Sequence, residues 1–260
     1  MTKKFLTVAI LFLLTNTVAA QDADTQAKVD EGVRSIKKKT LDFKLETRFF
    51  LPNLNAQLKA ADFRYNGGRV DLRDDLNFTR DNAPEIIFRY KNFSVDWLHV
   101  HGTGKSSVVG VMNFGGKNFH GNLSSRSDLD FVKLKFDREI FSLMGTGLEW
   151  NVALNALSWR GRTSDENSSA TKKFFGILPS VGINFYMRIR PRLDIYAQVS
   201  WLPLGRHGHF EDFESGLKYF PQENFSVNAG WRRIGWKFRR GGDLSKFTLN
   251  GPFVGLRYDF

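Results

Sequence analysis

Apolar and polar side chains alternate at every second position along much of the chain, which is the spacing of a β-strand with one apolar face. In residues 192–201, five apolar side chains from Leu193 to Trp201 alternate with mostly polar ones. The runs at 146–160 and 174–189 show the same alternation. Such runs exceed the five or six residues usual in soluble strands and match the ~9–11 residues that cross a bilayer at a tilt. The pattern therefore predicts β-strands that span a membrane.

Read in this way, the chain contains about ten strands that form an all-β, transmembrane, antiparallel up-and-down β-barrel. The number must be even if both ends of the chain lie on the same side, and eight or twelve strands remain open. The reason is that Arg232-Arg233 and Gly251-Pro252 break the alternation and resemble β-bulges. The predicted strands are 41–51, 84–91, 93–104, 127–138, 146–160, 174–189, 192–201, 209–220, 223–239 and 244–260.

The connections between these strands alternate in length. Short turns are predicted at 91–92, 139–145, 190–191 and 221–222. Longer loops are predicted at 52–83, 105–126 and 161–173. Bacterial barrels show this alternation, with the short turns in the periplasm and the long loops outside the cell.

The first 20 residues read as a cleaved signal peptide. Lys3 and Lys4 precede a short apolar run from Phe5 to Leu14, and Val18-Ala19-Ala20 offers small residues for cleavage. An uncleaved anchor is the alternative, but the run has about half of the ~20 residues that a spanning helix needs. Residues 21–40 are then a polar periplasmic segment, and residues 41–260 are the barrel.

The end of the chain carries the most specific pattern. Val254, Leu256, Tyr258 and Phe260 fall on one face of the last predicted strand. This resembles the C-terminal assembly signal of bacterial outer-membrane proteins, and it implies the bacterial outer membrane as location and the barrel-assembly machinery as partner. The resemblance covers residues 41–260 and is to small Gram-negative outer-membrane β-barrel proteins in general, not to a specific member.

Composition agrees with this interpretation once the alternation is considered. The mean hydropathy of −0.33 looks soluble, but lipid-facing and lumen-facing residues cancel in a barrel. The chain has no cysteine, so its stability must come from strand pairing and burial. The pI of about 9.8 would suit nucleic acid, but the compartment argues against that partner.

If the apolar face points outward, acidic and basic side chains are balanced in the lumen. A ten-stranded barrel is narrow enough for side chains to fill it, which predicts a narrow or side-chain-plugged lumen, with a narrow channel as the alternative. The predicted network comprises Lys44, Arg48, Glu85, Arg89, Asp96, Lys133, Lys135, Glu149, Arg188, Glu214, Arg232 and Arg257. Further inward acidic residues are Asp42, Glu46, Asp137, Asp194, Asp212 and Asp259.

Excess positive charge lies in the outer loops and strand ends. Lipopolysaccharide, which forms the outer leaflet of such a membrane, presents phosphates and carboxylates that attract Arg and Lys. We therefore expect a monomer with a structural, envelope-interaction or limited small-solute role, exerted through its outer loops. The candidates for contact with lipopolysaccharide or another anionic ligand are Lys105, Arg126, Arg160, Arg162, Lys172, Lys173, Arg206, Arg239 and Arg240.

Neither a metal site nor a cofactor is expected. His99 and His101 form one His-x-His pair and His207 and His209 another, but the two pairs lie on strands about four apart. At a strand spacing of ~4.8 Å they are too distant to share an ion.

An enzyme is the alternative class, either a rim-sited hydrolase or a lipid-modifying barrel. Omptin barrel proteases also have ten strands, and they rely on an aspartate pair and an aspartate–histidine pair. This chain has no Asp-x-His, and its Asp74-Asp75 pair is typical of a turn. His101 with Ser106 and Ser107 would suit lipid modification. No catalytic residue is assigned, and we expect no enzymatic activity.

Overall fold

The computed structural model describes residues 42–59, 63–65, 70–77, 83–203, 208–240 and 243–260. The predicted signal peptide and the polar segment 21–40 lie outside these residues. Within the described residues, no helix is long and apolar enough to cross a membrane.

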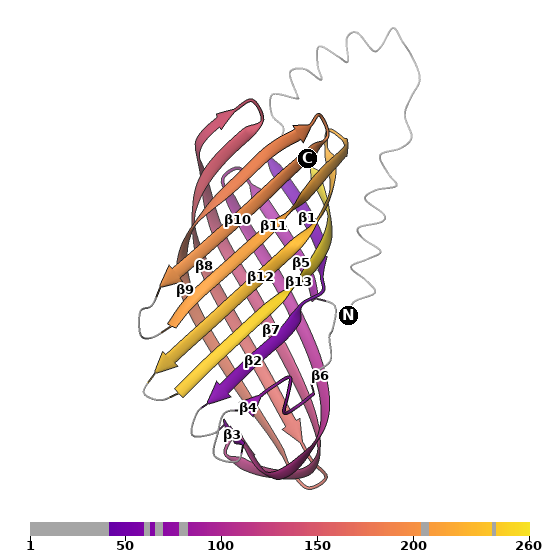
Figure 1. Ribbon diagram of the computed structural model, residues 1–260, viewed down its shortest axis with the longest axis vertical. Helices are drawn as coiled ribbons and strands as arrows, with labels where there is room; N and C mark the ends of the chain where they lie inside the picture. The colour runs from indigo at the N-terminus through magenta and orange to yellow at the C-terminus, as the bar shows by residue number, and fades with distance from the viewer. Residues whose placement is uncertain (1–41, 60–62, 66–69, 78–82, 204–207, 241–242) are drawn as a thin grey trace. The chain divides into compact units, whose positions relative to one another are not determined.

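The described residues form one antiparallel sheet that closes on itself (Figure 1). Its strands are β1 (Phe43–Phe50), β2 (Asn53–Lys59), β3 (Phe63–Tyr65), β4 (Val70–Asp71), β5 (Ala83–Tyr90), β6 (Phe93–Phe114), β7 (Lys117–Leu143), β8 (Thr146–Ser164), β9 (Ser169–Arg190), β10 (Leu193–Pro203), β11 (Gly208–Gln222), β12 (Phe225–Arg240) and β13 (Asp243–Asp259).

Ten of these strands, counting β1 and β2 as one, make the barrel wall. The wall runs from β1 through β5 and on in chain order to β13, which pairs with β1 again. β2 continues β1 along the same neighbour, β13, after a break at Pro52. The short strands β3 and β4 pair with β6 and β2 respectively. The predicted ten-stranded antiparallel barrel is confirmed.

The loops at 105–126 and 161–173 were predicted too long. β6 and β7 remain paired until a tight turn at Gly115-Gly116, where both glycines have positive φ values of 65° and 78°. β8 and β9 remain paired up to Ser164 and Ser169. At the other end of the barrel, the turn predicted at 139–145 is shorter than predicted, because β7 extends to Leu143 and β8 begins at Thr146.

An apolar belt surrounds the outside of the barrel near the end that carries the C-terminus, which is uppermost in Figure 1. Large apolar side chains on this surface are about half exposed, among them Leu154 at 52% and Ile183 at 53%. Trp97 and Trp231 lie at one edge of the belt, and Phe260 lies at the other. Exposed apolar bands with aromatic edges are the surface of barrels that sit in a bilayer.

Beyond the belt, the inward and outward faces exchange polarity. On β6, Asp96 is buried inside and Trp97 is exposed outside, whereas in the next two residues Leu98 is buried inside and His99 lies outside. The same exchange occurs on four other strands. It lies between Val132 and Phe131 on β7, Ala156 and Leu157 on β8, Asp212 and Glu211 on β11, and Arg232 and Arg233 on β12.

We call this boundary the inversion line. The belt zone runs from it to the turns near Lys91 and Pro191, and the cap zone runs from it to the hairpin ends near Gly115 and Asp165. The line explains why the alternation breaks at Arg232-Arg233. The pairing of β12 with β13 continues without a register shift through this point and through Gly251-Pro252, so the two predicted bulges are wrong.

Candidate functional site

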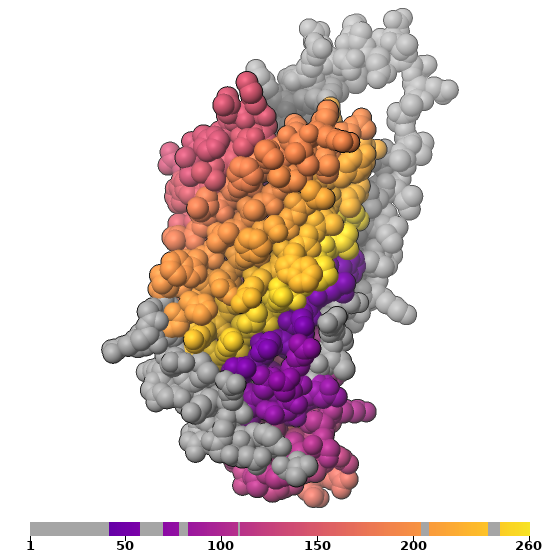
Figure 2. All heavy atoms as spheres, in the orientation of Figure 1, coloured from indigo at the N-terminus to yellow at the C-terminus, as the bar shows by residue number. Residues whose placement is uncertain are grey.

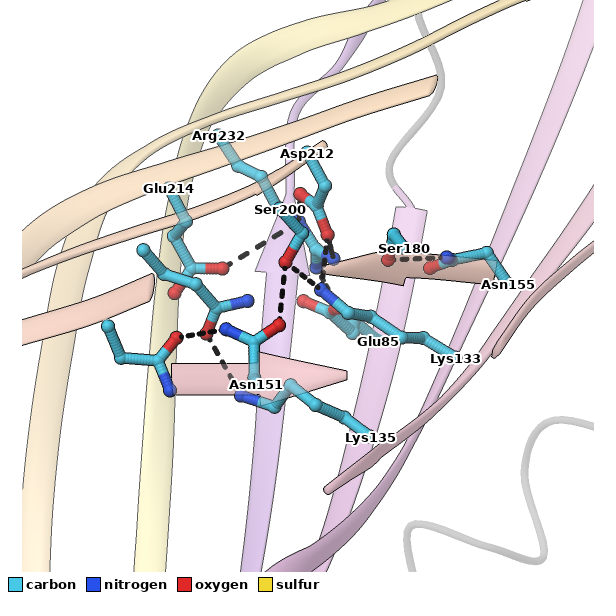
Figure 3. Close-up of polar contacts among 12 residues, drawn as sticks. Glu85, Lys133, Lys135, Asn151, Asn155, Ser180, Ser200, Asp212, Glu214 and Arg232 are labelled. Atoms are coloured by element: carbon cyan, nitrogen blue, oxygen red, sulfur yellow. Dashed lines mark hydrogen bonds and ion pairs between the residues drawn. The ribbon is translucent and has the colours of Figure 1, made fainter. Parts of the chain in front are cut away.

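Inside the belt zone, Arg232 of β12 is the centre of a buried charge network (Figure 3). Its Nε and Nη2 donate to the two carboxylate oxygens of Asp212 on β11, each at 3.0 Å. Its Nη1 donates to Glu85 on β5. The arginine side chain is only 2% exposed, and Glu85 and Asp212 are also buried. Two carboxylates therefore hold one guanidinium in a fixed orientation.

Arg48 of β1 extends the network. Its Nη1 donates to Glu214 on β11 at 2.7 Å and lies 3.5 Å from Glu85. Its Nε donates to Glu46 on the same strand. The guanidinium also lies 4.7 Å from the ring centre of Phe253, within the range of a cation–π interaction.

Lys133 of β7 completes the network from the opposite wall. Its Nζ donates to Asp212 at 2.9 Å and to the hydroxyl of Ser200 at 3.4 Å, and its side chain is fully buried. Ser200 in turn donates to the amide oxygen of Asn151 at 3.2 Å. Nearby, Lys135 lies 3.2 Å from a carboxylate oxygen of Asp137.

These contacts cross the lumen. In the ring of strands, β7 is four positions from β11, while β5 is three positions from β12. The pairs Lys133–Asp212 and Glu85–Arg232 therefore join parts of the wall that have no backbone contact. Charges that leave water need partners of this kind, because an unpaired buried charge is costly.

Inside the cap zone, the lumen contains apolar side chains. Phe131 stacks on Phe210 with ring centres 6.2 Å apart, and Trp236 meets Phe210 edge-on at 6.1 Å. Trp159 packs against Phe247 at 5.9 Å. All five rings are at most 3% exposed. The interior thus has a charged layer and an apolar layer in succession.

The residues predicted for the lumen network divide into three groups. Arg48, Glu85, Asp96, Lys133, Lys135, Glu214 and Arg232 are buried. Partly exposed positions are Lys44, Arg89, Glu149 and Arg257. Arg188 lies apart from the network, because it is exposed at the end of β9 and its Nε donates to Asp194 at 3.0 Å.

Sequence reasoning missed the apolar layer. Its signal is present, because apolar residues are adjacent where the inward face changes, as at Trp97-Leu98. Within a strand of uniform alternation such a pair has no place, and it marks where the apolar face turns inward.

Five of the predicted basic contact residues are exposed on the outer surface of the cap zone. They are Lys105, Arg126, Arg160, Arg162 and Lys173. Arg126 faces Arg162 directly across β7 and β8, and Arg160 faces Lys173 across β8 and β9. Like charges directly opposite each other destabilise a sheet unless an anion neutralises them.

The other basic candidates are placed differently. Lys172 is only partly exposed, and neighbouring Lys173 is the residue that points outward. Arg239 and Arg240 lie at the end of β12, where the structure does not describe their side chains, and Arg206 lies outside the described residues.

The described members of the two His-x-His pairs do not converge. The Nδ1 atoms of His99 and His101 lie 2.8 and 2.6 Å from carboxylate oxygens of Asp130 and Asp128 on β7. His209 is on β11, across the ring, and His207 lies outside the described residues. Within the described part of the chain, no three acidic or histidine side chains gather as metal ligands.

These two aspartate–histidine pairs were also missed, because they form between strands and not along one. The residues proposed for lipid modification do not meet: His101 is outward, and Ser106 is on the opposite face of β6. Ser107 shares the face of His101 but lies six residues away, roughly 20 Å along a strand. The Asp74-Asp75 pair lies in the turn that follows β4. There the Oδ2 of Asp75 accepts a hydrogen bond from the backbone N–H of Asp71 at 2.7 Å.

Known proteins resemble this chain in fold. No protein-family model matches it, and no curated protein matches its sequence. The outer membrane protease OmpT from Escherichia coli matches with a TM-score of 0.51 and 12% identity, over 85% of this chain and 99% of that chain. The translocator domain of the autotransporter NalP from Neisseria meningitidis matches with a TM-score of 0.43 and 9% identity, over 91% and 98% of the two chains.

At such low identity the likeness concerns the fold alone. Neisserial surface protein A has a TM-score of 0.36 and 9% identity, over 84% of this chain and 97% of that chain. The closed antiparallel barrel with its exposed apolar belt is the fold of bacterial outer-membrane β-barrel proteins. The chain is therefore an outer-membrane barrel.

Proposed function

We propose that this protein is a non-conducting outer-membrane barrel that acts through its outer surface in the cell envelope. The observation that carries the proposal is the succession of two filled layers in the lumen. An ion that entered from one side would have to separate Arg232 from Asp212 and then pass the stacked rings of Phe131 and Phe210.

The two layers oppose permeation in different ways. The charged layer is held by hydrogen bonds that cross the lumen, so opening it would leave buried charges without partners. The apolar layer excludes water from its surface, and a hydrophobic constriction closes a pore by dewetting.

The outer surface is then the part that meets other molecules. Lys105, Arg126 and Arg162 lie on it beyond the apolar belt, on the side where the anionic groups of lipopolysaccharide are found in an outer membrane. We propose that these side chains bind such anions, and that the protein is a monomer without catalytic activity. The last strand, ending at Phe260, would be recognised by the barrel-assembly machinery.

Single-channel recording in a planar bilayer tests the closed lumen. The refolded protein is compared with three variants: Lys133→Ala with Arg232→Ala in the charged layer, Phe131→Ala with Phe210→Ala in the apolar layer, and all four changes together. We expect a silent bilayer from the unaltered protein and from both double variants, and openings from the quadruple variant alone. Steady, ion-selective openings of the unaltered protein would overturn the proposal and favour a narrow channel.

Folding of each variant is checked by its β-sheet circular dichroism and by the change of gel mobility on heating. If the quadruple variant does not fold, the recording of the unaltered protein still tests whether the lumen is closed. Openings from the charged-layer variant alone would show that the apolar layer does not close the lumen.

A further inference from the structure

A pocket of about 280 Å³ lies on the outside of the cap zone, where β12, β13 and β2 run side by side. The face formed by these strands is turned toward the viewer in Figure 2. Three cationic side chains line the pocket: Arg233 of β12, Lys246 of β13 and Arg73 of the turn that follows β4. None of these residues belongs to the basic surface on β6 to β9.

The pocket is poorly neutralised. The Nε of Arg233 donates to Glu211 at 2.9 Å, but among the described residues that line the pocket none is a carboxylate. Within the described residues, Arg73 and Lys246 have no ion pair. Lys246 also faces Lys237 directly across β12 and β13. Such an arrangement of like charges is stable when an anion occupies it.

The remaining lining is suited to hydroxyl groups. Asn53 and Asn250 face each other across β2 and β13, and Asn55 faces Thr248. The side-chain oxygen of Asn55 is buried and finds no hydrogen-bond partner in the part of the chain that the structure describes. A buried acceptor without a donor costs free energy, so a hydroxyl donor from a ligand would stabilise the site.

The edge of the apolar belt lies directly beside the pocket. Asn250, which lines it, accepts a hydrogen bond from the indole Nε1 of Trp231 at 2.7 Å, while the ring of Trp231 remains 47% exposed in the belt. Leu51, which precedes β2, is 50% exposed on the same side. A molecule whose anionic head filled the pocket would therefore lay its apolar tails along the belt.

We infer that this pocket binds the phosphorylated sugar headgroup of a glycolipid of the outer leaflet. The cations take the phosphate, and the amides and Thr248 take sugar hydroxyls. The volume is below the ~300–1,000 Å³ that encloses a whole drug-sized ligand, which fits a headgroup better than a complete molecule. The inference rests on the proposed outer-surface role only in placing the cap zone at the outer leaflet.

Native mass spectrometry of the refolded protein in detergent tests this site. Four probes are compared: bis-phosphorylated lipid A, the same lipid after removal of its phosphates, phosphatidylglycerol and inorganic phosphate. The pocket variant is Arg73→Gln with Lys246→Gln. The matched control, Arg190→Gln with Arg192→Gln, removes the same charge from exposed positions at the turn between β9 and β10, at the far end of the belt zone.

We expect the unaltered protein to retain one lipid A, the pocket variant to bind it at least tenfold more weakly, and the control to change less than threefold. Removal of the phosphates should weaken binding to a similar extent. Asn55→Asp, which places a carboxylate in the pocket without removing a cation, should also reduce lipid A binding. Gel mobility on heating confirms that each variant is folded.

Several outcomes would overturn the inference. Equal binding by the pocket variant and the unaltered protein would show that the lipid is held elsewhere, and equal loss in both variants would show diffuse attraction. Equal affinity for phosphatidylglycerol would show that the pocket does not recognise the sugar. Retention of inorganic phosphate as tight as that of lipid A would show that it recognises the phosphate alone. Conductance of the unaltered protein would contradict the closed lumen, but it would not affect the comparison of lipid A binding between the pocket variant and the control.

Discussion

The belt zone and the cap zone are made of the same strands, yet they bury opposite kinds of side chain. On β12, Arg232 is buried inside the belt zone, and Ile234, two residues further, is buried inside the cap zone. Outside, Trp231 is exposed in the belt and Arg233 is exposed beyond it. The two parts of one continuous strand therefore carry side chains suited to two different surroundings.

The surroundings explain the difference. Against lipid, an apolar outer surface is favourable, and polar groups are stable in the interior when they are paired. Against water, burial of apolar side chains is the main driving force, so they turn inward as in a soluble protein. The inversion line thus marks where the outer surface passes from lipid to water. Substitutions of neighbouring residues on one strand, or on its two faces, can therefore test where this line lies.

The largest contrast is expected between two adjacent arginines. Arg232→Ala leaves Asp212 and Glu85 buried without their partner, which should lower the free energy of unfolding by about 3–5 kcal/mol. Arg233→Ala removes only an exposed pair with Glu211 and should cost less than about 1 kcal/mol. Urea unfolding of both variants in lipid vesicles, followed by tryptophan fluorescence, measures the difference. Equal costs would contradict the assignment of the two faces at this point of β12.

A second contrast compares two phenylalanines of β11. Phe210 is fully buried against Phe131 and Trp236, so Phe210→Ala should cost about 3–5 kcal/mol through the cavity it leaves. Phe213 is 41% exposed on the belt, and Phe213→Ala should cost close to 1 kcal/mol, as an average substitution does. The same unfolding experiment checks both values. A larger loss at Phe213 would mean that the cap zone has no apolar core of its own.

A third contrast places a charge on the outer surface of β8. Leu154→Arg puts a guanidinium into the belt and should cost about 2–4 kcal/mol, whereas Ser158→Arg lies in water and should change stability by less than about 0.5 kcal/mol. The yield of vesicle insertion and the unfolding midpoint are the measurements. If the two substitutions were equally tolerated, the belt would end before Leu154.

The sequence allowed the fold to be predicted because alternation of period two is strong wherever one face meets lipid. The runs that end at Trp201 and Phe260 have one apolar face, and they are strands in the structure. The strand extensions beyond Gly104 and Arg160 were predicted as loops, because their outward faces carry polar residues such as Lys105 and Arg162 and their inward faces are interrupted by glycine and serine.

The candidate site was predicted less completely, and the reason is geometric. That Lys133 and Arg232 point inward follows from alternation along each strand. That both reach Asp212 depends on the curvature of the closed barrel, which brings β7 opposite β11 and which no local pattern records. The pocket at Asn55 likewise arises from the register of β2 against β13 and from a turn that places Arg73 beside them.

The smallest effect is expected at the far end of the cap zone, in the turn between β8 and β9. Desolvation raises the pKa of Asp165, but the backbone N–H groups of Asn167 and Ser168 donate to its Oδ1 at 2.9 and 2.6 Å and lower the pKa. Together these hydrogen bonds outweigh the desolvation, so the pKa lies below the ordinary value. A lowered pKa in the folded state stabilises the turn above the unfolded pKa, and this stabilisation is lost as the pH falls through the folded pKa. The amide resonance of Ser168, followed by NMR during acid titration, should therefore shift at a pH below that of an unperturbed aspartate. Asp165→Asn should abolish this step, and a titration at or above the ordinary pKa would show that the turn does not keep these hydrogen bonds in water.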